Sequence, residues 1–367
     1  MTQRVFVFSP DSPERPGGVE HFVRELIKGL DLRGYKVEVF HKDNSTPAWL
    51  RNRPDRLSRR ISGSLTGFFV GRKAMKTFDD SVVAIISNST VGYWPMRSPR
   101  TSLKRFHFYH GTYRGQAQAI RKLISYRGYL FVKWWESMVI ERLSGRAKTV
   151  FSCSDPIRDE VQEYFGFPST TMWYPIDLSK FSPRSQADSR RALGIKPGES
   201  VGTFVGNTSP MKNFPIVRAL IKAMPEINWL LAIRGNVVTE FRDNPRVKVF
   251  QDASPNQVSE LYAAADFSLC PSLYDPFPYV VSESLACGTP VIAASHGASR
   301  FHLSDPPLNR LLVSDANSAE EFIGAVREVL RDPVLYRRIV TERARPRLLD
   351  TMAPENWWRR FFEHTGL

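Results

Sequence analysis

Residues 271–292 combine a loop carboxylate, a helix start and a second carboxylate inside that helix. Asp275 lies in a loop that follows an apolar strand, and Glu283 lies about one turn inside the helix expected at 279–286. The free N–H groups and the positive dipole end of the helix start suit a diphosphate. Glu283 can accept hydrogen bonds from vicinal hydroxyls such as those of a ribose, and Asp275 can do the same for a sugar at the other end of the ligand. The alternative is that Asp275 and Pro276 only start a turn and that Glu283 is a solvated helix residue.

Alternating strands and helices must position these residues. A strand at Val5–Phe8 leads through a loop that ends in two glycines to an amphipathic helix, and a strand at Val37–Phe40 follows. Because no hairpin signal intervenes, this order predicts a parallel sheet. The same pattern predicts further strands at 82–86, 106–109, 201–205, 229–233, 247–250, 266–270 and 290–294, and helices at 214–224, 256–265, 279–286 and 319–330, the last after capping-box spacing from Ser318 to Glu321.

The segment 171–184 lacks periodicity and contains two prolines, which is typical of a linker. The chain is therefore expected to form two doubly wound α/β domains, 1–180 and 181–349. Such sheets bind ligands at the carboxyl ends of their strands, so the cleft between the two domains is the expected active site. The apolar end of the chain, 350–367, is expected to form a helix that packs back on the first domain.

The net charge of the 367-residue chain is +14, from 51 basic and 37 acidic residues. Residues 1–180 carry 29 basic and 17 acidic side chains, whereas 181–367 carry 22 and 20. Between Ser81 and Trp135 there are nine Arg or Lys and no Asp or Glu. A basic face of this kind attracts nucleic acid, a phosphorylated small molecule or an anionic membrane, and composition does not choose among them.

The cysteines and apolar runs indicate a compartment. Cys153, Cys270 and Cys287 are widely separated and lack C-x-x-C spacing, so neither a disulfide framework nor a zinc site is indicated. The chain has no signal-peptide core and no apolar run near the roughly 18 residues that a membrane-spanning helix needs. We expect a cytoplasmic protein, in which any membrane contact is peripheral and on the inner face.

The stretch around Asp275 and Glu283 resembles the signature of the retaining nucleotide-sugar glycosyltransferases of family 4, which have the GT-B architecture. In that signature an acidic residue, seven intervening residues and a Glu precede a tail like Ala286–Ile292. Other motifs of the family are matched in chain order by Gly17-Gly18, His110 after a strand, Phe204-Val205-Gly206 followed by Lys212, and Tyr262–Asp266 before the acidic motif.

The resemblance implies an α/β fold with two Rossmann-like domains that face each other across a cleft, the N-terminal one for the acceptor and the C-terminal one for the donor. It implies transfer of a sugar from a nucleotide diphosphate to a hydroxyl with retention, without a protein nucleophile and with no metal or other cofactor. The departing phosphate oxygen would help to deprotonate the acceptor. No Asp-x-Asp motif that could hold a metal is present.

The resemblance also implies the site residues. His110 would contact the donor sugar or orient the acceptor, and the alternative for it is a histidine with satisfied hydrogen bonds at a strand end. Lys212, the glycine loop and the helix start after Asp275 would stabilise the leaving diphosphate. The implied catalytic residues are His110, Lys212, Asp275 and Glu283. The implied donor-binding residues are Gly17, Gly18, Gly206, Asn207, Lys212, Phe277, Pro278, Tyr279, Val280 and Glu283.

Four departures from the family pattern fall in the donor loops. Asp275 is one methylene shorter than the usual Glu, and Asn207 stands where the family usually has an Arg. One of two phosphate cations is therefore missing, and Lys212 would need help from a basic side chain elsewhere. The segments 233–236 and 295–298 each keep one of two usual glycines.

Basic and aromatic residues alternate in two segments of the expected acceptor domain, 51–76 and 120–135. This pattern suits an anionic lipid surface and predicts peripheral membrane binding with a lipid-linked or anionic saccharide acceptor, as in cell-surface polysaccharide or glycolipid synthesis. The alternative is a solvated helix face with an ordinary core stripe. Two other functions stay open, a GT-B sugar-nucleotide epimerase or hydrolase and a non-catalytic polyanion-binding protein. No nucleic-acid-binding motif is visible, so nucleic acid is not an expected partner.

Overall fold

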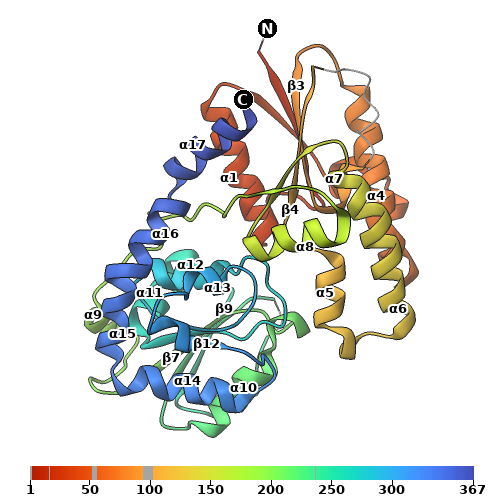
Figure 1. Ribbon diagram of the computed structural model, residues 1–367. Coiled ribbons are helices and arrows are strands. Elements are labelled where there is room, and N and C mark those ends of the chain that lie inside the picture. The colour runs from red at the N-terminus through yellow and green to blue at the C-terminus, as the bar shows by residue number, and fades with distance from the viewer. Residues whose placement is uncertain (1, 16, 52–55, 94–101, 236) are drawn as a thin grey trace. The chain divides into compact units, whose positions relative to one another are not determined.

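The computed structural model describes residues 2–15, 17–51, 56–93, 102–235 and 237–367, without the side chains of 50–64. The chain divides into two compact units, each built on a six-stranded parallel sheet (Figure 1). The first unit contains Met1–Pro175 and Trp357–Leu367, and the second contains Ile176–Asn356. The boundary therefore lies at residue 175 rather than at 180.

The first sheet has the strand order β2-β1-β3-β4-β5-β6, so the order reverses between β1 and β3. Its strands are β1 Arg4–Phe8, β2 Lys36–Phe40, β3 Val82–Asn88, β4 Lys104–Tyr109, β5 Thr149–Ser152 and β6 Thr170–Thr171. Residues Val5 to Phe8 are all fully buried. Helices cover both faces of a parallel sheet, which explains a continuous apolar strand in place of alternation.

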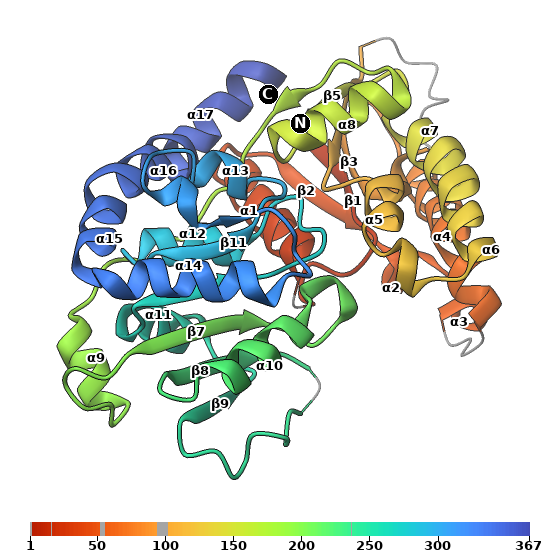
Figure 2. The same cartoon turned by 60° about the horizontal axis from the view of Figure 1, so that its bottom comes forward.

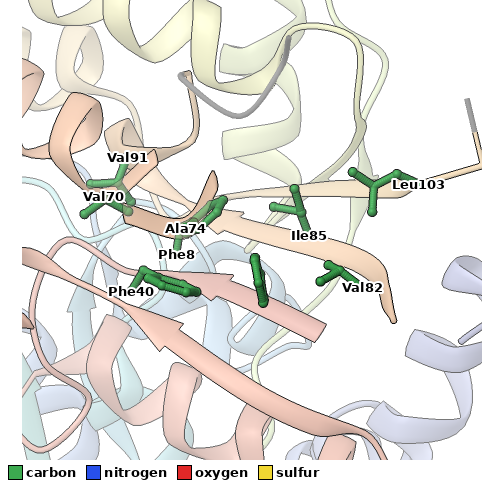
Figure 3. Close-up of a cluster of buried hydrophobic side chains, with 9 residues drawn as sticks. Phe8, Phe40, Val70, Ala74, Val82, Ile85, Val91 and Leu103 are labelled. Carbon is green, nitrogen blue, oxygen red and sulfur yellow. The ribbon is translucent and has the colours of Figure 1, made fainter. Parts of the chain in front are cut away.

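One core cluster of the first unit joins its sheet to a long helix. Phe6 and Phe8 of β1 pack with Phe40 of β2 and with Val70 and Ala74 of α4, all at most 5% exposed (Figure 3). The helical segments of this unit are α1 Gly18–Leu32, α2 Lys42–Ser45, α3 Ala48–Arg51, α4 Arg56–Lys76, η1 Ser89–Gly92, α5 Tyr113–Ala119, η3 Arg121–Leu123, α6 Tyr126–Phe131, the π-helix η4 Val132–Glu141, α7 Arg142–Gly145 and α8 Asp155–Phe165. The last helix, α17 Pro354–Thr365, belongs to this unit from Trp357 on.

The second sheet has the order β9-β8-β7-β10-β11-β12, so its order reverses between β7 and β10. Figure 2 shows β7, β8 and β9 side by side in this sheet. Its strands are β7 Val201–Gly206, β8 Asn228–Ile233, β9 Val247–Gln251, β10 Phe267–Cys270, β11 Val291–Ala294 and β12 Leu312–Val313. Ligands of doubly wound sheets bind beyond the carboxyl ends of the strands at such a reversal. The loops after β7 and β10 are thus the expected place for a ligand in this unit.

The helices of the second unit include one whose predicted cap is only half formed. Ser318 accepts a hydrogen bond from the Glu321 N–H at 3.2 Å, as predicted at the start of α14. The second bond of a capping box, from the Ser318 N–H to the Glu321 carboxylate, does not form. Glu321 Oε2 accepts instead from the N–H groups of Ser314 and Asp315. The segments are α9 Gln186–Ala192, η5 Pro210–Lys212, α10 Phe214–Ala223, α11 Pro255–Ala264, α12 Tyr279–Ala286, α13 Ser299–His302, η6 Leu308–Leu311, α14 Ala319–Arg331, α15 Pro333–Ile339, the π-helix η7 Val340–Ala344 and α16 Arg345–Met352.

The start of the segment expected to be a linker and the end of the chain are both well packed in the first unit. Met172, Trp173 and Tyr174, in the segment expected to be a linker, are at most 8% exposed. In α17, the buried rings of Trp357 and Phe361 contact Phe22 and Phe108 of the first unit at 5.7 and 6.3 Å between centroids. In the ranges that the structure describes, no helix is both long enough and apolar enough to cross a membrane.

Candidate active site

The loops that follow β7 and β10 lie side by side at the reversal of the second sheet. The Leu273 N–H donates to the Met211 carbonyl at 2.8 Å and joins the two loops through their main chains. Next to this bond, Lys212 Nζ lies 2.5 Å from Asp275 Oδ2. The side chains of Lys212 and Asp275 are 29% and 14% exposed. The structure therefore brings a cation and a carboxylate together at the expected ligand position.

Local structure fixes the backbone that carries Lys212. The helix η5 ends at Lys212, and Asn213 follows in the left-handed region with φ 52°. Asn213 is buried, and its Nδ2 donates to the Ala316 carbonyl at 2.6 Å. Asparagine tolerates this conformation better than most residues, and the buried hydrogen bond holds it in place. The turn aims Lys212 toward the loop after β10.

The charge of Lys212 is stabilised by its surroundings. Burial opposes the ammonium, but the negative charge and hydrogen bond of Asp275, with a smaller effect of Glu283, raise the pKa of Lys212. Lys212 is therefore cationic throughout the neutral pH range.

Asp275 depends on a glycine in the next loop of the sheet. Gly297 has φ 47°, and a Cβ at this position would lie 2.3 Å from the carbonyl oxygen of Asp275 and 2.5 Å from that of Pro276. The neighbouring Ala298 N–H donates to the Pro276 carbonyl at 3.2 Å. A side chain at position 297 would push the Asp275 loop away, so the glycine kept in segment 295–298 has a steric reason.

The helix α12 begins directly after this loop. Its N-cap residue is Pro278, which has no side-chain acceptor, and its first turn contains no acidic residue. The Val281 N–H donates to the Pro278 carbonyl at 3.0 Å, and the N–H groups before it in the first turn can serve an anion. Phe277 is buried and packs its ring against Tyr279 and His302, so its side chain anchors the loop. Tyr279 and Val280 are half-buried in the first turn.

Glu283 lies on α12 and contacts a buried tyrosine. Tyr262 Oη, at the end of α11, donates to Glu283 Oε2 at 3.4 Å. Burial raises the pKa of Glu283 to about 7, although the Tyr262 hydrogen bond and the positive charges of Arg234 and Lys212 act in the opposite direction. A diol that donates hydrogen bonds to this carboxylate would favour its ionised form.

Gly206 and Asn207 shape the entry to the Lys212 loop. Gly206 is the last residue of β7. Asn207 Oδ1 accepts a hydrogen bond from the Ser209 N–H at 3.0 Å, which forms a local turn. The side chain of Asn207 thus stabilises the loop and brings no charge to it.

Two family models match the chain, one over most of the first unit and the other over most of the second. Residues 16–180 match Glycosyltransferase Family 4, and residues 185–347 match Glycosyl transferases group 1. A D-inositol 3-phosphate glycosyltransferase of Segniliparus rotundus is 33% identical over 328 residues, which cover 79% of this chain and 72% of that protein. The chain belongs to glycosyltransferase family 4.

Curated relatives and similar solved structures define how far the likeness extends. A D-inositol 3-phosphate glycosyltransferase of Mycobacterium sp. strain JLS is 31% identical over 182 residues, 46% of this chain, and the match spans only 41% of that protein. Sucrose-phosphate synthase from Thermosynechococcus elongatus superposes with a TM-score of 0.79 at 20% identity, over 99% of this chain and 98% of that one. HepE of Anabaena, in complex with UDP and glucose, has a TM-score of 0.71 at 17% identity over 99% of both chains. The predicted GT-B fold and family 4 membership are confirmed.

The histidine that the family motif singled out is fully engaged inside the first unit. The Asn88 amide donates through Nδ2 to the Phe8 carbonyl at 2.9 Å, which turns its Oδ1 toward His110 Nε2 at 2.8 Å. His110 Nδ1 bonds to the Tyr174 hydroxyl. Burial lowers the pKa of His110 to about 3, so the ring is neutral, with its proton on Nε2 and its Nδ1 accepting from Tyr174.

Both ring nitrogens of His110 therefore have protein partners, which favours the alternative of a satisfied histidine at a strand end. A role toward the donor sugar or the acceptor stays a prediction, and it requires one of these two bonds to open. Phe22 of α1 packs on the same ring at 5.1 Å between centroids.

The glycine loop of the family carries an acidic neighbour here. Gly17 is the N-cap of α1, and Gly18 is its first residue. Glu20, in the first turn, folds back so that its Oε2 lies 1.9 Å from the position of a Cβ at Gly17. Burial raises the pKa of Glu20. An anion at this helix start would meet Glu20, so the side chain must turn away before Gly17 and Gly18 can bind a phosphate.

The structure gathers Lys212, Asp275 and Glu283 at one edge of the second sheet, whereas Gly17, Gly18 and His110 belong to the first unit. The sequence matched Tyr262 as part of the Tyr262–Asp266 motif but gave it no role. Asn88 and Tyr174 were not predicted, because their contacts with His110 are too distant in the chain to leave a local signal. Within the described ranges, no group of three or more His, Cys, Asp or Glu side chains is arranged to hold a metal.

Proposed function

We propose that the protein is a retaining glycosyltransferase that moves a sugar from a nucleotide-diphosphate sugar to a hydroxyl of a saccharide or lipid-linked acceptor. The observation that carries this proposal is the meeting of Lys212, Asp275, Glu283 and the uncapped start of α12 at the reversal of the second sheet. A diphosphate, a ribose and a sugar each find complementary groups there.

In the proposed mechanism the protein stabilises the leaving group. The bond between the anomeric carbon and the diphosphate oxygen breaks through an oxocarbenium-like transition state, while the acceptor oxygen bonds to that carbon on the same face. The ammonium of Lys212 and the first N–H groups of α12 stabilise the charge that develops on the diphosphate. The departing phosphate oxygen takes the acceptor proton, and neither a protein nucleophile nor a metal is assigned.

The remaining residues orient the donor. Glu283 accepts hydrogen bonds from the ribose hydroxyls, and Asp275 accepts them from the sugar. For Gly17 and Gly18, which belong to the first unit, binding of a phosphate through backbone N–H groups stays a prediction. The binding of UDP and glucose by HepE and the activity named for the Segniliparus rotundus relative support a sugar nucleotide as donor, and UDP-sugars are the first to test.

The acceptor side of the proposal concerns residues 120–135. Tyr126, Trp134 and Trp135 are 62%, 59% and 45% exposed, although the π-helix η4 buries Glu136 and Glu141 on its other side. This inverted arrangement, with tryptophans outside and carboxylates inside, is not that of an ordinary core stripe. The guanidinium of Arg121 also lies over the rings of Tyr126 and Tyr129, at 5.3 and 4.7 Å from their centroids. These features support an anionic lipid surface, on the inner face of a membrane, as the place where the acceptor is met.

The second basic segment, 51–76, is only partly described. Residues 52–55 lie outside the described ranges, as do the side chains of 50–64, which include Arg51, Arg53, Arg56, Arg59 and Arg60. The proposal for the membrane surface therefore depends on residues 120–135.

The test combines binding and turnover. A thermal-shift screen against UDP-, GDP-, ADP- and dTDP-sugars should reveal one donor that raises the melting temperature, because a ligand of the native state stabilises it. Sugar release from that donor should require an added acceptor. Release without acceptor would indicate an epimerase or hydrolase, and no binding of any sugar nucleotide would refute the proposal.

A further inference from the structure

Among the described residues at the carboxyl edge of the second sheet, Arg234 has a cationic side chain without a partner. The residues that directly follow the six strands of this sheet are Asn207, Arg234, Asp252, Pro271, Ser295 and Ser314. Among these described positions Arg234 is the one with a positive side chain. It follows Ile233 of β8, which is paired in register with Gly206 of β7. Arg234 therefore lies one strand away from the loop that carries Lys212.

The backbone around Arg234 is held on both sides. The Arg234 N–H donates to the Gly206 carbonyl at 2.8 Å. On the other side, the Gly235 N–H donates to Asp252 Oδ1 at 3.1 Å, and Gln251 Nε2 donates to the Gly235 carbonyl at 3.0 Å. Gly235 has φ 84°, a conformation that glycine adopts without strain. The main chain of Arg234 is thus anchored between the ends of β7 and β9.

The guanidinium of Arg234, by contrast, is uncommitted. In the part of the chain that the structure describes it makes no hydrogen bond, ion pair or ring contact, and the residue is exposed. Lys212, the other cation of this edge, is already paired with Asp275 at 2.5 Å. Asp252, which directly follows the neighbouring strand β9, uses its carboxylate to accept hydrogen bonds from the Gly235 N–H and the Gln251 amide. A free guanidinium on an anchored backbone can bind a ligand without first breaking an ion pair.

The Arg234 charge also reaches the site. Its effect on the Glu283 carboxylate, which lowers the pKa of that group against burial, exceeds the effect of Lys212. The charge of Arg234 therefore acts on Glu283, the residue to which the proposed function assigns the ribose. A ribose at Glu283 has its phosphates attached within a few ångströms, close to the guanidinium.

We propose that Arg234, which directly follows β8, is the second phosphate-binding cation of the donor site and supplies the charge that Asn207 does not bring after β7. The inference rests on the proposed function, since it assigns a residue to the same donor. The planar fork of an Arg can bind two oxygens of a phosphate, and the anchored backbone reduces the entropy lost on binding. The ligand class is a nucleoside diphosphate, bound through its phosphates rather than its base.

The experiment is calorimetric titration of UDP, GDP, ADP and dTDP into the full chain and into three variants. Arg234→Gln should weaken the nucleotide that binds best by about tenfold, and Arg234→Lys should recover part of this loss because it keeps the charge. Arg327→Gln is the matched control, because Arg327 is an exposed Arg of α14 without a described partner, and it should bind like the wild type.

The salt dependence of the affinity distinguishes a contact of Arg234 with the phosphates from a contact with the base. An ion pair with phosphate makes affinity fall with salt, so the logarithm of affinity should fall less steeply with the logarithm of salt in Arg234→Gln than in the wild type. A loss of affinity with an unchanged salt slope would assign Arg234 to the base and overturn the phosphate role. Wild-type affinity in Arg234→Gln would overturn the inference and leave the proposed function standing. If the wild type binds none of the four nucleotides, the inference fails, and the proposed function fails with it only if the sugar nucleotides of the thermal-shift screen do not bind either.

Discussion

Replacing Asp275 by Asn removes the negative charge that holds Lys212 and preserves the shape of the side chain. In the structure Lys212 Nζ lies 2.5 Å from Asp275 Oδ2, so the ammonium that should bind the donor phosphate is already occupied. A nucleoside diphosphate must take Lys212 from Asp275. We therefore expect Asp275→Asn to bind UDP more tightly than the wild type, although it should be the poorer enzyme.

The magnitude follows from the burial of the pair. Fully exposed ion pairs contribute about 0–1 kcal/mol, and removing one partner of a buried pair costs about 3–5 kcal/mol. With side chains 29% and 14% exposed, the pair falls between these limits. Removal of a competitor worth about 1–2 kcal/mol would tighten UDP binding by about 5- to 30-fold. The sugar loses its charged acceptor in the same variant, so the ratio of the UDP-sugar affinity to the UDP affinity should fall.

The assay is calorimetry with UDP and with the donor sugar nucleotide on the wild type and on Asp275→Asn, with the melting temperature as a check on folding. Asp177→Asn is the control, because it breaks another Lys–Asp pair of the second unit, Lys180 with Asp177 at 2.6 Å. This control should leave both affinities unchanged. UDP binding that is equal or weaker in Asp275→Asn would refute the idea that Asp275 competes with phosphate for Lys212.

Four further outcomes are expected. Between pH 8 and pH 6 the affinity for the UDP-sugar should fall about tenfold as Glu283, with a pKa of about 7, loses its charge, and a titration of Glu283→Gln should show weaker binding with little pH dependence. Gly297→Ala should reduce donor affinity more than thermal stability, because its Cβ would displace the Asp275 carbonyl, and a melting curve beside a titration separates the two. Lys212→Ala should lower kcat more than it raises KM in steady-state kinetics if the ammonium serves the leaving group. In flotation assays the protein should rise with anionic vesicles at low salt, and a double Trp134→Ala, Trp135→Ala variant should stay with the soluble fraction.

Several elements of the fold could be predicted because their signals are local. The helix α12 occupies the predicted residues 279–286, bounded by Pro278 and a glycine turn. The strand β5, Thr149–Ser152, was not predicted, because four residues between helices give too little pattern. The preceding helix contains ten residues of π-helix, for which the sequence carries no simple periodicity. The segment after β6 shows no periodicity either, since it is buried on several sides without forming a regular element.

The candidate site was predictable as a set of positions but not as a set of contacts. Spacing places Lys212 and Asp275 after two strands of one sheet, yet it does not show that these strands flank the reversal or that the side chains form an ion pair. His110 is engaged by Asn88 and Tyr174, 22 and 64 residues away, and such separations are invisible to motif spacing. The sequence singled out the segment of Arg234 only because it lacks a glycine that the family usually has. The hydrogen bonds that anchor its backbone between β7 and β9 could be found only in the structure.

In the proposed donor site, a ligand must redistribute the charges. The second half of the chain is nearly neutral, and its site holds Lys212 against Asp275, while Arg234 and Lys212 act on Glu283. A diphosphate that takes Lys212 releases Asp275, which is then free to accept from the sugar hydroxyls. Its ribose stabilises the ionised form of Glu283, and that negative charge in turn favours the cations around it. Binding of the phosphate, the ribose and the sugar should therefore be mutually dependent. The affinity for UDP alone should be lower than the separate contributions of its phosphate and ribose would add up to. The affinity for a complete sugar nucleotide should be higher than the separate contributions of phosphate, ribose and sugar would add up to.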